Sequence, residues 1–183
     1  MDFPIHTTKT AQEPAKHILE GIEKGLKFVP NLIGVMAESS ALVAGYTTLS
    51  RIFDQTSFDA TEKQIILLTV SAENGCTYCV AAHTVIAGMQ SVPEDVVNAI
   101  RDNQPLANPK YEALRQFTQA VVETRGWPDA GQIADFLGAG YEKRHILDVV
   151  LGVGVKTLSN YTNHIAQTPL DDAFASAKWH KAD

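Results

Sequence analysis

The sequence has no long apolar run and no excess of positive charge. Uninterrupted apolar stretches such as Ile65–Leu68 are far shorter than the roughly 20 residues of a membrane-spanning helix. Residues 1–10 hold no apolar segment of secretory length. Basic residues number 15 against 21 acidic ones, a net charge of −6, and an acidic surface repels polyphosphate. We therefore expect a cytoplasmic protein that binds neither a membrane nor a nucleic acid.

Cysteine is scarce, because the chain has only Cys76 and Cys79. A disulfide between them would close a very short loop and add little stability, since that contribution grows with loop length. In a reducing compartment such a pair is more often catalytic or metal-binding than structural. The pair therefore indicates a catalytic or metal-binding site rather than a structural disulfide.

The rest of the composition is ordinary for a globular protein. Apolar residues make up 45% of the 183 residues and charged residues 20%. Disorder, collagen-like repeats and a disulfide scaffold are excluded. The length suits a single domain over residues 1–183.

Helical spacing recurs along the chain, and no convincing alternation of apolar and polar residues indicates a strand. Two Thr/Ser capping boxes, Thr61–Gln64 and Ser91–Glu94, are expected to open helices, and Asn74-Gly75 to end one. The sequence predicts an all-α protein of eight to ten helices. They are placed at 15–28, 31–36, from Ser39 or Ser40 to about 54, 61 to about 73, 76–87, 91–102, 108–125, 129–138, 141–167 and 170–177.

Two glycines, Gly152 and Gly154, lie inside the longest predicted helix. Each costs about 1 kcal/mol of helix propensity relative to alanine. Glycines in such positions permit another backbone to approach closely. We favour packing within the chain as the reason, with a subunit interface as the alternative.

Three residues near the middle of the chain have the spacing of one helical face: Cys76, Cys79 and His83. Cys79 and His83 are four residues apart, so an imidazole is in reach of the thiol proton. The N-terminus of a helix also favours a thiolate, which is the reactive form of cysteine. The helix end favours Cys76 as the more acidic thiol, whereas the histidine favours Cys79.

Two other interpretations of these residues stay open. Buried, inert cysteines beside a hydrogen-bonded histidine are one. The other is a zinc site of Cys76, Cys79 and His83 with Glu73 or His164 as the fourth ligand, although no second Cys-x-x-Cys is present. We favour a redox-active dithiol without a metal or cofactor, because no phosphate loop or dinucleotide fingerprint occurs.

These motifs resemble a known family. The capped apolar helix followed by Asn-Gly-Cys-x-x-Cys and a histidine, over 61–87, is similar to the alkylhydroperoxidase D-like branch of the carboxymuconolactone decarboxylase family. Phe28-Val-Pro-Asn-Leu32 and the segment Lys156-Thr-Leu-Ser-Asn-Tyr-Thr-Asn-His164 are also typical of it. The likeness covers a core of about 28–170. It implies an all-α bundle with a duplicated helix hairpin, assembled into trimers or hexamers.

The resemblance also implies roles for the three residues. Cys79 matches the cysteine that attacks a peroxide and becomes a sulfenic acid, and Cys76 matches the partner that converts it to a disulfide. His83 matches the relay histidine. The function expected is peroxide reduction in antioxidant defence, with recycling by a lipoyl or thioredoxin-like dithiol donor. Decarboxylase-type chemistry, or a redox-sensing or metal-binding module without turnover, are the alternatives.

The chain departs from the family pattern at the relay carboxylate, where it has Gln64. A glutamine does not exchange a proton as a carboxylate does. Gln64 either orients His83 across a helix hairpin or serves the capping box with Thr61. Glu73 is the nearest carboxylate that could replace the missing one, and Tyr78 is expected to pack or to line the pocket.

Three polar residues of the longest predicted helix complete the candidates. Asn160, Asn163 and His164 have the spacing of one helix side. They are expected to support the dithiol site or to satisfy buried backbone groups.

Overall fold

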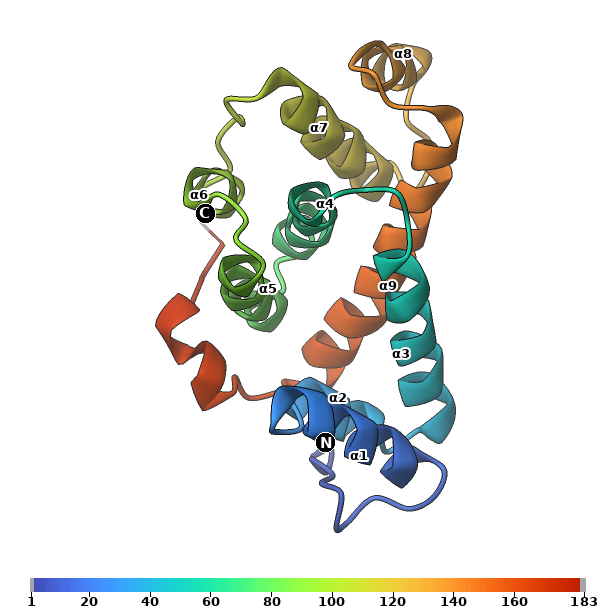
Figure 1. Cartoon of the computed structure of the whole chain (residues 1–183), viewed down its shortest axis with the longest axis vertical. Coiled ribbons are helices and arrows are strands. Elements are labelled where there is room, and N and C mark those ends of the chain that lie inside the picture. The colour runs from blue at the N-terminus through green and yellow to red at the C-terminus, as the bar shows by residue number, and fades with distance from the viewer. Residues whose placement is uncertain (1, 182–183) are drawn as a thin grey trace.

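The computed structural model describes residues 2–181, and every regular element in that range is a helix (Figure 1). The expected all-α fold is therefore confirmed. Nine α-helices and one 3-10 helix lie within 2–181: α1 (Ala15–Leu26), α2 (Asn31–Met36), α3 (Ser40–Asp54), α4 (Ala60–Glu73), α5 (Thr77–Met89), α6 (Glu94–Arg101), α7 (Pro109–Glu123), α8 (Ala130–Gly138), α9 (Lys143–Ala166) and η1 (Asp172–Ala177). Within these residues no helix combines the length and apolarity that a membrane span requires.

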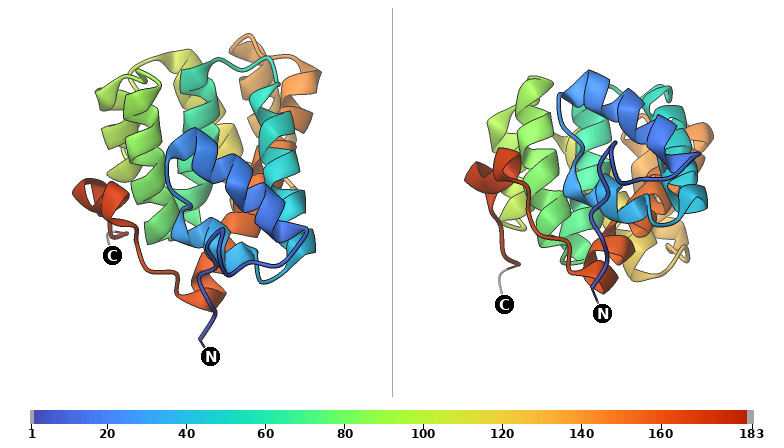
Figure 2. Two further views of the ribbon diagram at one scale, coloured as in Figure 1. Left: turned by 60° about the horizontal axis from the view of Figure 1, so that its bottom comes forward. Right: turned by 90° about the horizontal axis from the view of Figure 1, so that it is seen from below.

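The hairpin of α4 and α5 lies at the centre of the bundle. Helices α6, α7 and α9 pack against α4, and α3 runs along α9 (Figure 1). Helices α1 and α2 cross one end, and η1 lies beside α5 on the outer side (Figure 2). The N-terminal, central and C-terminal parts of the chain thus meet around the first turn of α5.

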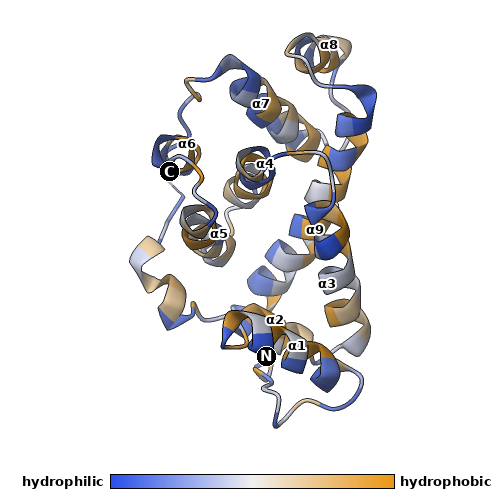
Figure 3. Cartoon of the chain, viewed as in Figure 1, coloured by the Kyte–Doolittle hydropathy of each residue, from blue (hydrophilic) through white to orange (hydrophobic). Residues whose placement is uncertain are grey.

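The apolar interior consists of two clusters. One surrounds α4, α7 and α9 and includes Phe53, Ile66 and Phe117. The other lies between α1, α2, α3 and α5 and contains both cysteines. Hydrophobic and hydrophilic residues alternate along the outer helices (Figure 3), as expected for helices that bury one face.

Side-chain caps start several helices as the sequence predicts. The Ser39 hydroxyl accepts from the Leu42 N–H at 3.3 Å, and Asn108 caps α7 with Pro109 at the first position. Asp129 and Gln132 form a capping box at the predicted start of α8. These local signals therefore suffice for those helix starts.

The two Thr/Ser capping boxes are wrong. Helix α4 begins at Ala60, because Asp59 and Glu62 cap it instead: the Glu62 N–H donates to Asp59 Oδ1 at 2.8 Å and the Asp59 N–H to Glu62 Oε2 at 3.0 Å. Helix α6 begins at Glu94 without a side-chain cap, and Ser91 lies in the turn before it with φ +58°.

Several predicted helix ends shift by a few residues. Helix α5 continues past Gly88 to Met89, since one glycine costs only about 1 kcal/mol and does not stop a packed helix. Helix α9 is slightly shorter than predicted, and the last element is a 3-10 helix.

Gly152 is the glycine of α9 that packing within the chain requires. A Cβ at this position would lie 2.7 Å from Ile66 Cγ2 and 2.8 Å from Phe53 Cε2, both of which are buried in the core. At Gly154, by contrast, a Cβ would meet nothing within 4 Å. The packing interpretation thus holds for Gly152 only.

We expect Gly152→Ala to lower the free energy of unfolding by up to about 2 kcal/mol. Overpacking of a filled core costs roughly 1–3 kcal/mol, and the better helix propensity of alanine offsets about 1 kcal/mol of that. Denaturant unfolding measures the change. Gly21→Ala in α1, where a Cβ has open space, is the control and is expected to stabilise the chain. Equal stabilisation by both substitutions would contradict the packing described.

Candidate active site

The turn between α4 and α5 places the cysteines. Helix α4 ends at Glu73, Asn74 caps it, and Gly75 takes a left-handed φ of +66°. The chain then reverses, and Cys76 becomes the N-cap of α5 while Cys79 falls in its first turn. The Cys76 N–H donates to the Ser71 carbonyl at 2.9 Å, which fixes the reversal.

Both cysteines are reduced and are 1% exposed. Polar side chains of α9 reach them from the other side of the bundle. Asn163 Nδ2 lies 3.3 Å from Cys79 Sγ and 3.7 Å from Cys76 Sγ, and Cys79 Sγ lies 3.8 Å from Ser159 Oγ. A single amide thus contacts both sulfur atoms.

The surroundings favour a thiolate on Cys79. Burial raises the pKa of its thiol, but a hydrogen bond from Cys76, the charge of Lys156 and hydrogen bonds from α9 outweigh burial, and the pKa falls well below the ordinary value. The pKa of Cys76 is raised by its hydrogen bond to Cys79 and by burial. The negative charge of the pair therefore resides on Cys79, despite the place of Cys76 at the helix end.

Two glutamines position the His83 ring through consecutive hydrogen bonds. Its Nδ1 lies 2.9 Å from Gln64 Oε1, and Gln64 Nε2 donates to Gln90 Oε1 at 2.9 Å. An amide oxygen only accepts, so in this arrangement Nδ1 carries the proton and Nε2 has the free lone pair. Burial and the charge of Lys156 lower the pKa of His83 well below its usual value, which keeps the ring neutral.

Cys79 and His83 line a cavity of about 430 Å³ between α1, α2, α3, α5 and η1. Lys156 and Tyr46 also reach it, whereas Cys76 does not line it. Its remaining walls are almost entirely apolar: Ile22, Gly25, Leu26, Phe28, Pro30, Leu32, Ile33, Tyr78, Ala82, Ile86, Met89 and Phe174. A ligand in this cavity would therefore contact Cys79 and not Cys76.

Tyr78 lines the cavity and also ties its walls together. Its hydroxyl donates to Asp171 Oδ2 at 2.5 Å and accepts from the Leu32 N–H at 3.3 Å. Asp171 in turn accepts from the Asn31 N–H at the start of α2. Burial and the hydrogen bond to Asp171 raise the pKa of Tyr78, so it stays protonated.

Two of the candidate residues lie away from the cysteines. Glu73 lines a separate cavity of about 370 Å³ with Arg115 and Lys181, because the last turn of α4 faces α7. His164 is exposed and stacks on Tyr161, whereas its neighbour Asn163 is buried. Asn160 is buried, and its Oδ1 accepts from Asn74 Nδ2 at 2.9 Å.

The zinc site considered above therefore lacks its fourth ligand. Neither Glu73 nor His164 approaches the sulfur atoms, and no group of three potential metal ligands occurs among residues 2–181. The donor set of Cys76, Cys79 and His83 does not fit a structural zinc centre, which needs four ligands.

Sequence reasoning missed Lys156 and Ser159, as well as Gln90 and Asp171. Lys156 is 1% exposed, although lysine in a helix is usually solvated. One signal was present: Lys156, Ser159 and Asn163 have the i, i+3, i+7 spacing of a single face. That pattern places the lysine on the same side as a buried asparagine.

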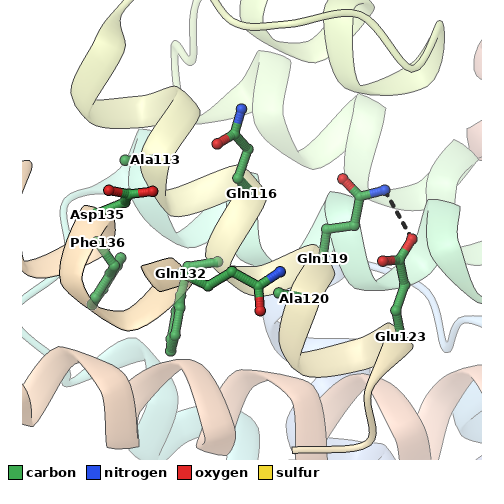
Figure 4. Close-up of a pocket in the computed structure, with 9 residues that line it drawn as sticks. Ala113, Gln116, Gln119, Ala120, Glu123, Gln132, Asp135 and Phe136 are labelled. Atoms are coloured by element: carbon green, nitrogen blue, oxygen red, sulfur yellow. Dashed lines mark hydrogen bonds between the residues drawn. The ribbon is translucent and has the colours of Figure 1, made fainter. Parts of the chain in front are cut away.

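A third cavity, of about 270 Å³, lies between α7 and α8 (Figure 4). Its side chains are mainly polar, and Gln119 donates to Glu123 at 3.1 Å. It contains neither cysteine nor histidine among its lining residues. We therefore place the candidate active site at Cys79.

Comparison with known proteins agrees with this fold. Residues 41–123, from α3 to the end of α7, match the model of the carboxymuconolactone decarboxylase family. This match confirms the family resemblance found in the sequence. No curated protein matches the chain.

Solved structures resemble the chain over almost its whole length. An alkylhydroperoxidase AhpD core protein, described as peroxidase-related and from Ralstonia eutropha JMP134, has a TM-score of 0.84 at 18% identity, with 94% of this chain and 93% of that one covered. A peroxidase-related protein from Silicibacter sp. TM1040 has a TM-score of 0.80 at 16% identity, with coverages of 95% and 92%.

A third similar structure is a variant of the debrominase Bmp8 in complex with 2,3,4-tribromopyrrole. Its TM-score is 0.80 at 20% identity, and the match covers 97% of this chain and 95% of that one. At identities this low, the structural likeness shows a shared alkylhydroperoxidase D-like fold and no more.

Proposed function

We propose that this protein is a dithiol peroxidase that reduces organic hydroperoxides or hydrogen peroxide through Cys79, Cys76 and His83. The observation that carries the proposal is a cysteine with a lowered pKa that lines an apolar cavity, beside a second cysteine that shares its hydrogen-bond partner Asn163. The family match and the fold of the peroxidase-related proteins support the same chemistry.

The proposed reaction uses the two cysteines one after the other. The Cys79 thiolate attacks the terminal oxygen of the hydroperoxide, the O–O bond breaks, and the alkoxide takes up a proton to leave as an alcohol. Cys79 is then a sulfenic acid. The Cys76 thiol condenses with it to form a disulfide and water, with the Nε2 lone pair of His83 as the base for the Cys76 proton.

An external dithiol must reduce the disulfide to close the cycle. Both sulfur atoms are buried, and the cavity that Cys79 lines is mostly apolar. These features favour a slim aliphatic dithiol such as a lipoyl arm over the active site of a globular thioredoxin-like protein. Dihydrolipoamide is accordingly the reductant chosen for the assays below.

A second candidate reaction uses the same pair of cysteines. The apolar cavity also suits a halogenated aromatic compound, and one similar structure is that of a debrominase. The Cys79 thiolate would attack the halogen, the carbon–halogen bond would break, and the ring carbanion would take up a proton. Cys76 would then displace halide from Cys79 and form the same disulfide.

One experiment separates these candidates. The reduced protein is mixed with dihydrolipoamide and, in separate reactions, with cumene hydroperoxide, hydrogen peroxide or a brominated pyrrole. A dithiol peroxidase consumes the hydroperoxides and forms the alcohol or water without bromide release. Bromide release alone would favour dehalogenation, and no turnover with any of them would leave the redox-sensing alternative or decarboxylase-type chemistry.

The proposal includes a homo-oligomer, a trimer or a hexamer. Helix α9 presents Leu147, Val150, Tyr161 and Ile165 to solvent, and a Cβ at Gly154 on the same face would have open space. Exposed apolar side chains along one helix face are typical of an interface.

We expect sedimentation at micromolar concentration to show a species several times heavier than the 19.9 kDa chain. Ile165→Glu places a charge among these apolar side chains and is expected to dissociate the assembly, because an unpaired charge in an apolar interface is costly. Trp127→Glu, in an exposed loop, is the control that keeps the assembly. A wild-type species of single-chain mass would contradict the proposal.

A further inference from the structure

Lys156 is a buried cation beside the reactive cysteine. It lies in the middle of α9, its side chain is 1% exposed, and it lines the same cavity as Cys79 and His83. Burial of an ammonium group removes its hydration and is tolerated only where a negative charge or hydrogen bonds replace the water. A lysine at this depth therefore needs a partner.

Within residues 2–181 no carboxylate forms an ion pair with Lys156, and the ion pairs there join other side chains. The titratable groups that interact with its charge are Tyr46 on α3, Cys76 and Cys79 at the start of α5, and His83 in the middle of α5. Among these groups, Cys79 is the thiol that lines the same cavity as Lys156, whereas Cys76 does not line it.

Only one of the four groups is anionic near neutral pH. Burial raises the pKa of Tyr46, and the hydrogen bond to Cys79 together with burial raises that of Cys76, so both keep their protons. His83 is neutral and has no negative form in this range. The remaining group is the thiolate of Cys79, whose charge raises the pKa of Lys156 in return.

We propose that the Lys156 ammonium is the counterion that holds Cys79 as a thiolate and the donor that protonates the alkoxide released from the hydroperoxide. The first part concerns the resting protein, and the second rests on the proposed peroxidase activity. Neutral His83 cannot act as this donor through Nε2, because that nitrogen carries no proton while Nδ1 donates to Gln64. Lys156 is the cation that lines the cavity with Cys79.

The protons and electrons balance over the cycle. Cys79–S⁻ and ROOH give Cys79–SOH and RO⁻, and RO⁻ takes a proton from Lys156 to give ROH and a neutral amine. Cys76–SH and Cys79–SOH then give the disulfide and water. When the external dithiol reduces the disulfide, the Cys79 thiol returns its proton to the Lys156 amine. Lys156 thus loses its positive charge in the same step in which Cys79 loses its negative charge.

The first test measures ionisation of Cys79 without any peroxide. In a Cys76→Ser background, which leaves one thiol, thiolate absorbance and the alkylation rate by iodoacetamide are recorded against pH. Lys156→Met is expected to move the Cys79 midpoint up by about 1–3 pH units and to slow alkylation at pH 7 by about tenfold or more, since a nearby cation lowers a thiol pKa by such amounts. Lys156→Arg, which keeps the charge, is expected to restore most of the shift.

The controls separate an electrostatic role from a structural one. Lys143→Met removes an exposed lysine at the start of the same helix and is expected to leave the midpoint unchanged. Methionine has a similar length and no charge to desolvate, so Lys156→Met is expected to melt at or above the wild-type temperature. An unchanged Cys79 midpoint in folded Lys156→Met would overturn the proposal.

A second measurement needs no variant. Nitrogen NMR of the wild-type lysine side chains at pH 7 is expected to show Lys156 as an ammonium in the dithiol form and as a neutral amine in the disulfide form. The same charge in both forms would overturn the donor role. If the wild type consumes no peroxide while Lys156→Met still raises the Cys79 midpoint, the proposed function fails and the counterion stands.

Discussion

Cys79→Ser is expected to abolish peroxide consumption, with a loss of at least about 10³-fold, as is common when an enzyme loses its nucleophile. A serine hydroxyl does not ionise near neutral pH, so neither Lys156 nor Asn163 can produce a nucleophile there. Cys79 is also the cysteine that lines the cavity. Consumption of cumene hydroperoxide with dihydrolipoamide as reductant measures the loss.

Cys76→Ser is the matched control for this substitution. It is expected to reduce one equivalent of peroxide and then stop, with a sulfenic acid on Cys79 that a dimedone-type reagent traps. The pKa directions favour this order, because the thiol of Cys76 is hard to ionise while Cys79 keeps its charge. A sulfenic acid trapped on Cys76 in the Cys79→Ser protein would show that the two roles are reversed.

Gln64→Glu is expected to raise the rate of disulfide formation near neutral pH by about tenfold or more. A carboxylate 2.9 Å from His83 Nδ1 would stabilise the imidazolium and so make Nε2 a stronger base. A complete general-base effect is worth roughly 10²–10⁴-fold, and burial of the new carboxylate takes away part of it. Rapid-mixing measurements of a single turnover at several pH values give the rate.

The pH dependence of the rate of disulfide formation shows in which direction Gln64→Glu acts. The pKa of His83 is lowered in the wild type, so the ring is neutral at pH 7 and becomes protonated only in more acidic solution. The glutamate is expected to raise that pKa and to move the acidic limb of the rate profile toward neutral pH. Glu73→Gln, which lies in a different cavity, is expected to change neither the rate nor the profile. A rate loss in Glu73→Gln as large as the gain in Gln64→Glu would contradict the site described.

Part of this structure could be predicted because its causes are local. Helix α2 falls on the predicted range, since Pro30 ends one pattern and the apolar residues after it are contiguous. Asn108 with Pro109, and Asp129 with Gln132, are caps that neighbouring residues determine alone. The capping box at Thr61 was wrong because a stronger acceptor, Asp59, lies just upstream with Glu62 at the required spacing.

The other part depends on contacts between distant segments. From spacing alone Gln64 had two equal interpretations, and the structure decides between them because the α4–α5 hairpin brings its amide to His83. The choice between Cys76 and Cys79 likewise depends on Lys156, which comes about 80 residues later in the chain. Glu73 looked close to the cysteines in sequence, yet the last turn of α4 directs it toward Arg115.

The most direct measurement counts the thiols of the wild-type protein before and after one equivalent of cumene hydroperoxide, in the absence of any other thiol. We expect the loss of both titratable thiols, one equivalent of cumyl alcohol, and a peptide in which Cys76 and Cys79 are joined by a disulfide that dihydrolipoamide reverses. Retention of both thiols in the folded protein, with the hydroperoxide unconsumed, would contradict the account.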